Sequence, residues 1–285
     1  SIVGPATGLQ SPYGVALDMV HQELFVACDG DSEIHVYPLD ADGDVAPLRT
    51  ISGALTTLFA PTGITVDTVN DEIMVANNAA QTVVTFARDA DGNVAPLRTI
   101  GGSATGLSFL RMLTVDLVHD ELYVGGYASS VFVFDRLDDG DVAPKRRISG
   151  PATGIDRPRG LFVNPFAGEL FVVDKESDSI LVFDRTADGN ATPLRTISGP
   201  MTLLGEPRGL LLTVNGEIVT TSPTVAFPQD ADGDVPPSWV HNTGGGRGLI
   251  STRAAFNGCG LVVDGRLFAD GFESGDPSAW STSVP

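Results

Sequence analysis

The chain carries the segment DADGDVAPLRTI at residues 40–51, and this segment decides the fold because it recurs along the chain. It returns almost unchanged at residues 89–100, more loosely at 138–148 and 187–197, and as a worn copy at 230–241. The prolines of the first four copies follow one another at intervals of 49, 48 and 49 residues. A period of this size indicates a repeat architecture in which each unit is one supersecondary element.

Each unit predicts four short β-strands. The first follows a Pro-x-Gly sequence, as at residues 14–18 and 63–67, and the second follows a polar turn, as at 23–27. The third is β-branched or aromatic, as at 34–37, and the Leu-Arg-Thr-Ile stretch after the Asp-Gly turn is the fourth. These lengths and compositions are typical of strands bounded by turn residues. Four antiparallel strands per unit form the blade of a β-propeller.

Five units are complete, and a sixth has to be assembled from both ends of the chain. Its four strands would come from residues 248–251, 261–264, 266–270 and 1–4. The N-terminal contribution is indicated because residues 2–8 repeat the pattern of residues 148–154, and closing the ring removes an open sheet edge. We therefore predict an all-β, six-bladed propeller in one domain over residues 1–272, followed by a C-terminal tail at 273–285. Five blades plus a tail is the alternative.

Two stretches resemble known families. The pattern Pro-x-Gly-(Val/Ile/Leu)-x-Val-Asp, then Glu-Leu-x-Val, then Val-x-Val-Phe, is similar to NHL-repeat propellers over residues 5–270. That family includes lactonase-like and lyase-like enzymes as well as scaffolds that only bind, so the resemblance implies a fold and leaves the activity open. The Asp-Gly-Phe-Glu-Ser-Gly stretch at 270–275 resembles the ending of many exported bacterial proteins. It implies a bacterial protein that is secreted, periplasmic or on the cell surface.

The composition of the chain limits the classes of partner that we expect it to bind. The chain has 36 acidic and 17 basic residues, a formal charge of −19, so its field repels phosphate backbones and nucleic acid is not expected as a partner. No apolar run is long enough for a membrane span. The first residue, Ser1, suits a mature chain after signal removal. Cys28 and Cys259 lack metal-ligand spacing, and they lie at opposite ends of their predicted second strands, so we expect no disulfide between them.

One position in the repeat gathers basic residues. It directly precedes the Gly, or its equivalent, that opens the first strand, and its successive occupants are Tyr13, Thr62, Arg111, Arg159, Arg208 and Arg247. First strands line the central channel, so these side chains are expected to ring its mouth. Several guanidinium groups facing one opening favour a bound carboxylate, phosphate or sulfate. The alternative is that each arginine pairs with a local carboxylate or points to solvent.

A second ring is predicted where the first strands end. Its members lie six residues after the proline position: Asp18, Asp67, Asp116 and Asn164, with Thr213 and Thr252 in the last two units. Carboxylate and amide oxygens suit Ca²⁺ or another hard cation. The alternative is that each side chain caps its own turn. The Asp-Gly loops, such as residues 40–44, place Gly fourth and lack a terminal Glu, so they predict hairpin turns instead of calcium loops.

The histidines do not predict catalysis. His21 and His119 occupy equivalent turns, and His35 and His241 fall near outer strands, so neither a zinc site nor a Ser-His-Asp arrangement is expected. No cofactor is indicated beyond the Ca²⁺ that the second ring could hold. The first hypothesis is therefore a secreted binding module for a protein, a glycan or a small anionic ligand. The alternatives are a metal-dependent, lactonase-like hydrolase or lyase with its cation in the channel, and a purely structural surface protein.

Overall fold

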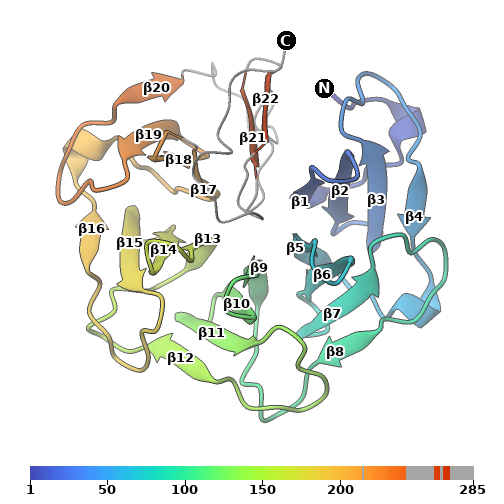
Figure 1. The fold of residues 1–285 in the computed structure, drawn as a ribbon, viewed down its shortest axis with the longest axis horizontal. Helices are drawn as coiled ribbons and strands as arrows, with labels where there is room; N and C mark the ends of the chain where they lie inside the picture. The colour runs from blue at the N-terminus through green and yellow to red at the C-terminus, as the bar shows by residue number, and fades with distance from the viewer. Residues whose placement is uncertain (214, 242–259, 264–265, 270–285) are drawn as a thin grey trace.

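The structure is a computed structural model that describes residues 1–213, 215–241, 260–263 and 266–269. It contains five four-stranded antiparallel sheets, each with its strands in sequence order, set around a central axis (Figure 1). The first strand of each sheet lies innermost and the fourth lies at the rim. The prediction of an all-β propeller with four-stranded antiparallel blades is confirmed.

The strand bounds follow the repeat. The first blade comprises β1 (Pro12–Asp18), β2 (Glu23–Cys28), β3 (Glu33–Pro38) and β4 (Arg49–Ile51). The second comprises β5 (Pro61–Asp67), β6 (Glu72–Asn77), β7 (Thr82–Ala87) and β8 (Arg98–Ile100). The third comprises β9 (Leu110–Asp116), β10 (Glu121–Gly126), β11 (Ser130–Asp135) and β12 (Arg146–Ser149).

The remaining strands complete two more blades. The fourth comprises β13 (Pro158–Asn164), β14 (Glu169–Asp174), β15 (Ser179–Asp184) and β16 (Arg195–Ile197). The fifth comprises β17 (Leu210–Leu212), β18 (Glu217–Thr220), β19 (Thr224–Pro228) and β20 (Trp239–His241). A separate two-stranded sheet contains β21 (Gly260–Val263) and β22 (Arg266–Ala269).

Five complete blades lie in the described residues, which matches the alternative prediction of five blades plus a tail. The two-stranded sheet of β21 and β22 lies between the fifth and first blades (Figure 1), but it does not make a fourth-strand ladder with residues 1–4 in the described chain. The predicted first strand at residues 248–251 and the tail from residue 270 lie outside the described residues.

The N-terminal segment instead docks on the first blade. Ile2 forms a parallel bridge with Gly43, and the same bridge joins each fourth-strand isoleucine to the Asp-Gly turn of the next blade. The acidic side chains of these turns reach back in the same direction: Asp91 accepts a hydrogen bond from the Thr50 amide at 3.2 Å. The loops that resembled calcium loops are therefore hairpin turns that join one blade to its neighbour.

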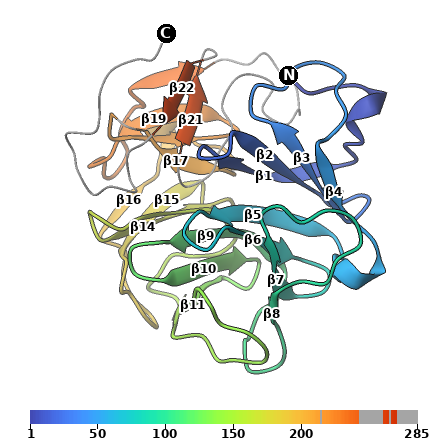
Figure 2. The same cartoon turned by 45° about the vertical axis from the view of Figure 1, so that its right-hand side comes forward.

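The hydrophobic core is divided into layers between neighbouring blades, which lie face to face around the axis (Figure 2). The layer between the first two blades, for example, contains Phe25 and Val36 from one and Ile73 and Val84 from the other. None of the helical turns in the described part of the chain has the length and apolar character required to cross a bilayer.

Glycines allow the inner strands to approach one another. A Cβ atom on Gly63 would lie 2.9 Å from the carbonyl oxygen of Arg111 and 2.9 Å from the Cα atom of Met112 in the next blade. A Cβ on Gly160 would lie 2.7 Å from the carbonyl oxygen of Arg208. Because the obstructing atoms are backbone, no side-chain rotation can make room. The glycines thus set the spacing of the blades at the axis, and with it the positions of the residues at the channel mouth.

We expect Gly63→Ala to lower the free energy of unfolding by about 1–3 kcal/mol, because overpacking against fixed backbone forces the two inner strands apart. Gly205→Ala is the matched control, since a Cβ there meets nothing within 4 Å and neither glycine has a positive φ. Urea unfolding of the wild type and both variants measures the free energies of unfolding to be compared. Equal stabilities for the two variants would contradict the close approach.

Candidate functional site

The structure brings together three members of the predicted ring, from three different blades. Tyr13 lies on β1, Arg111 on β9 and Arg159 on β13, so their contacts cross the mouth of the channel. The Arg159 Nη1 donates a hydrogen bond to the Tyr13 hydroxyl oxygen at 2.5 Å. The guanidinium carbon of Arg111 lies 5.3 Å from the centroid of the Tyr13 ring.

Tyr127 completes this group and was not anticipated from the sequence. Its ring centroid lies 4.6 Å from the guanidinium carbon of Arg111 and 4.8 Å from that of Arg159, and its hydroxyl accepts a hydrogen bond from Arg159. The predicted hairpin could have indicated that Tyr127 lies at the mouth. Tyr127 directly follows β10, whose last residue pairs with the first residue of β9, so it had to lie beside the ring position. We call Tyr13, Arg111, Tyr127 and Arg159 the mouth cluster.

The mouth cluster has two guanidinium groups, and neither has a carboxylate partner among the described residues. Among arginines whose side chains the structure describes, only Arg111, Arg147 and Arg159 form no ion pair with a carboxylate. The others pair as follows: Arg49 with Glu23, Arg88 with Glu23 and Asp71, Arg98 with Glu72, Arg136 with Asp67 and Asp120, Arg146 with Glu121, Arg157 with Glu176, Arg185 with Glu121, Arg195 with Glu169 and Arg208 with Glu206. In a chain of charge −19, two neighbouring unpaired arginines are an exception.

The tyrosine rings account for the proximity of these two like charges. A guanidinium over an aromatic face gains electrostatic attraction from the negative face of the ring. Arg157 also lies over the Tyr127 ring, with its guanidinium carbon 5.4 Å from the ring centroid. Unlike the other two arginines, it pairs with a carboxylate, that of Glu176, at 2.8 Å. The tyrosine hydroxyls accept from Arg159, which leaves their own protons to donate elsewhere.

The other three predicted members of the ring behave differently. Thr62 is fully buried, and its hydroxyl contacts the carbonyl oxygens of Ala76 and Leu110 at 3.2 Å each, so it holds two blades together and faces no ligand. Arg208 is exposed and lies 3.8 Å from Glu206, as the alternative interpretation predicted. Arg247 lies outside the described residues.

Among the described residues, the carboxylates of the predicted cation ring do not form a group at metal-ligand distances. Each of its four members caps its own turn: Asp18, Asp67 and Asp116 accept two backbone hydrogen bonds at 2.9–3.0 Å, and Asn164 accepts two at 3.1–3.2 Å. His21 and His119 add a ring nitrogen to Asp18 and Asp116 at 2.7 and 2.9 Å. The capping alternative therefore describes the geometry of these residues.

Three of these residues also face an arginine of the following blade. Arg136 places its Nη1 at 2.8 and 2.9 Å from the two carboxylate oxygens of Asp67, and both residues are buried. Arg88 and Arg185 approach Asp18 and Asp116 at 3.8 Å. At the junction between the fourth and fifth blades, the equivalent positions hold the neutral residues Asn164 and Gln229. The charges at these positions are thus matched in sign and number.

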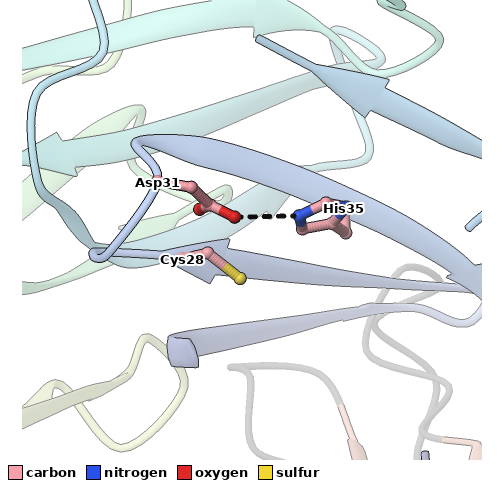
Figure 3. Close-up of side chains that lie close together, drawn as sticks. All are labelled: Cys28, Asp31 and His35. Atoms are coloured by element: carbon pink, nitrogen blue, oxygen red, sulfur yellow. Dashed lines mark ion pairs between the residues drawn. The ribbon is translucent and has the colours of Figure 1, made fainter. Parts of the chain in front are cut away.

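One group of possible metal ligands does lie close together in the described residues, and it corrects the expectation that no such cluster would form. The ligand atoms of Cys28, Asp31 and His35 all lie within 4.8 Å of one another (Figure 3). Cys28 forms no disulfide within the described residues, and Cys259 lies outside them. The hairpin register could have indicated this group, because Cys28 pairs with Glu33 and therefore shares a sheet face with His35.

The four-stranded sheets around a central axis define the chain as a β-propeller. No protein-family model matches the sequence, and no curated protein matches it either. Among solved structures, a chain in the crystal structure of the nidogen/laminin complex is similar, with 16% identity over 77% of this chain and 76% of that chain and a TM-score of 0.58. The WD40 β-propeller domain of Doa1 is similar with 15% identity over 78% of this chain and 66% of that chain and a TM-score of 0.57. At these identities the likeness establishes the fold alone.

We expect Arg136→Gln to destabilise the protein by about 3 kcal/mol, because it leaves the buried Asp67 carboxylate without its partner. Adding Asp67→Asn should restore most of that loss, since the chain already uses an Asn and a Gln at the equivalent junction. Chemical denaturation of the wild type, both single variants and the double variant gives the coupling energy. A double variant no more stable than Arg136→Gln would rule out a charge-matching role.

Proposed function

We propose that the protein is a binding module that takes an anionic group of its ligand at the mouth cluster. The observation that carries the proposal is the pair of guanidinium groups of Arg111 and Arg159, which share one tyrosine ring and have no carboxylate partner in the described chain. A carboxylate, phosphate or sulfate between them would form charge-assisted hydrogen bonds to both.

The hydrogen-bonding groups support an anion over other ligands. The cluster offers N–H groups of two arginines and the O–H groups of Tyr13 and Tyr127, and all of these can donate. A ligand that only accepts hydrogen bonds satisfies this set, whereas a cation or a neutral donor does not.

The charge of the whole chain limits the size of the anion. With a formal charge of −19, the protein repels an extended polyanion, so nucleic acid is disfavoured. A short anionic group that enters the mouth meets the arginines at contact distance, where the rest of the field is largely screened. We therefore favour a single acidic group of a protein or glycan, or a small free anion.

Two further features belong to this proposal. The repeat wording supports assignment to the NHL type, and the Asp-Gly-Phe-Glu-Ser-Gly stretch at residues 270–275 supports export from a bacterium. A protein partner is supported by the similar propeller from the nidogen/laminin complex, which is a complex between proteins. Cell fractionation of the native host with an antibody against the chain tests the export.

The test of the site compares sulfate, phosphate and acetate with chloride at equal ionic strength, by thermal melting and calorimetric titration. We expect wild-type protein to be stabilised by at least one of the oxyanions, and Arg111→Gln and Arg159→Gln to bind it at least about tenfold more weakly, because each charge-assisted hydrogen bond contributes about 1.5–3 kcal/mol. Titration with a short acidic peptide and a sulfated oligosaccharide then shows whether the anionic group belongs to a protein, a glycan or a small free anion.

The control is Arg147→Gln. Arg147 also has no carboxylate partner in the described chain, but it lies on β12 with its guanidinium carbon 5.0 Å from the Phe132 centroid, away from the mouth. Without ligand, Arg111→Gln should melt at or above the wild-type temperature, because it removes repulsion between like charges. Failure of every oxyanion to stabilise the wild type more than chloride, or equal weakening by Arg147→Gln, would refute the proposed site.

A further inference from the structure

The cluster of Cys28, Asp31 and His35 lies in the first blade, at the hairpin that joins β2 to β3. Cys28 is the last residue of β2, Asp31 lies in the turn, and His35 is on β3 (Figure 3). The His35 Nε2 lies 3.8 Å from a carboxylate oxygen of Asp31 and 3.4 Å from one of Glu33. Three side chains with metal-ligating atoms therefore converge within one hairpin, and Glu33 lies beside one of them, His35.

The positions are exceptional within the repeat. At the position of His35, the next three blades have the buried apolar residues Val84, Phe132 and Leu181. At the position of Cys28, they have Asn77, Gly126 and Asp174, and the second blade has Ala80 at the position of Asp31. The first blade thus departs from its relatives at three positions at once, and the three departures meet in space.

Two buried polar atoms of this cluster have no hydrogen-bond partner among the described residues. His35 is 3% exposed, and its Nε2 has no hydrogen-bond partner; one carboxylate oxygen of Asp31, Oδ1, is also buried without one. Burying a polar group without a partner is unfavourable, so atoms of this kind indicate a missing ligand. The other ring nitrogen, Nδ1, lies 3.2 Å from the Thr50 hydroxyl. That contact, with Nδ1 donating, leaves the lone pair of Nε2 directed into the cluster.

We propose that Cys28, Asp31 and His35 bind a zinc ion, with Glu33 or water as the fourth ligand. Thiolate sulfur, imidazole nitrogen and carboxylate oxygen are the ligands of Zn²⁺ in proteins, usually in tetrahedral geometry. Bond lengths of about 2.0–2.3 Å place such ligands roughly 3.3–3.6 Å apart. The separations of 3.4 and 3.8 Å at His35 Nε2 are already close to this, and small side-chain rotations close the remainder.

The charges fit a divalent cation. The Cys28 sulfur is buried, and its ligand atom lies within 4.8 Å of those of Asp31 and His35. On binding, the sulfur–zinc bond forms, the sulfur–hydrogen bond breaks, and the proton leaves to solvent. The metal then neutralises negative charge that the hairpin otherwise concentrates.

The test uses the full chain, stripped of metal and kept reduced, with each ligand replaced by the residue that another blade carries. The variants are Cys28→Asn, Asp31→Ala and His35→Leu. The new residues are those that other blades have at the equivalent positions: Asn77, Ala80 and Leu181, respectively. We expect the wild type to bind one Zn²⁺ per chain in titrations against a competing chelator, and the Cys28 and His35 variants to bind at least about 100-fold more weakly. Co²⁺ in place of zinc should show a thiolate charge-transfer band that Cys28→Asn abolishes.

The control is Cys259→Ser, which should bind Zn²⁺ and Co²⁺ as the wild type does. Far-ultraviolet circular dichroism of the metal-free variants checks that each is folded, and Asp31→Ala, which changes the turn and neither strand, is used if a strand variant is not folded. The proposal is overturned if the wild type binds no zinc, if His35→Leu binds it unchanged, or if the cobalt thiolate band is lost in Cys259→Ser and kept in Cys28→Asn.

Discussion

At the axis of this propeller, backbone packs directly on backbone, and the glycines of the inner strands permit that contact. Gly63 and Gly160 each face a carbonyl of the next blade, and in both cases the carbonyl belongs to a residue of the channel mouth, Arg111 or Arg208. The spacing of the blades at the axis therefore determines the positions of the residues at the mouth. Tyr13, on the first blade, reaches Arg159 on the fourth because the inner strands lie this close.

The mouth cluster combines two opposing effects. Its arginines repel each other, and the aromatic faces of Tyr13 and Tyr127 reduce that repulsion without cancelling either charge. Elsewhere in the described chain every arginine except Arg147 pairs with a carboxylate, so two neighbouring unpaired arginines at the mouth are an exception. Sites that are unfavourable when empty are often those at which a ligand binds.

The sequence predicts the blade and much of the mouth, since both follow from the repeat. Tyr13, Arg111 and Arg159 were found because they share one position, whereas Tyr127 was missed because it lies in the turn of a different strand. The number of blades could not be derived, because the last unit lacks the clear wording of the others. Asp67 was interpreted as a ligand because a strand-end carboxylate looks the same whether it faces the channel or, as here, its own turn and Arg136.

The zinc cluster was missed for the opposite reason. Comparison of the units draws attention to what they share, whereas Cys28 and His35 matter because no other blade described has them at these positions. Separation along the chain also hides them, since only the pairing of β2 with β3 shows that they share a face. Residues that break a repeat therefore deserve the same scrutiny as residues that maintain it.

The alternation of charge at the blade junctions also determines the order in which blades can follow one another. A duplicated second blade fits between the first and the fourth, because it brings Arg88 for the carboxylate before it and Asp67 for the arginine after it. Placed after the fourth blade, the same copy would set Arg88 against Asn164 and Asp67 against Gln229, with each charge unmatched. The propeller can therefore lengthen by duplication within its first half, while the junction of Asn164 and Gln229 marks a boundary that such growth does not cross.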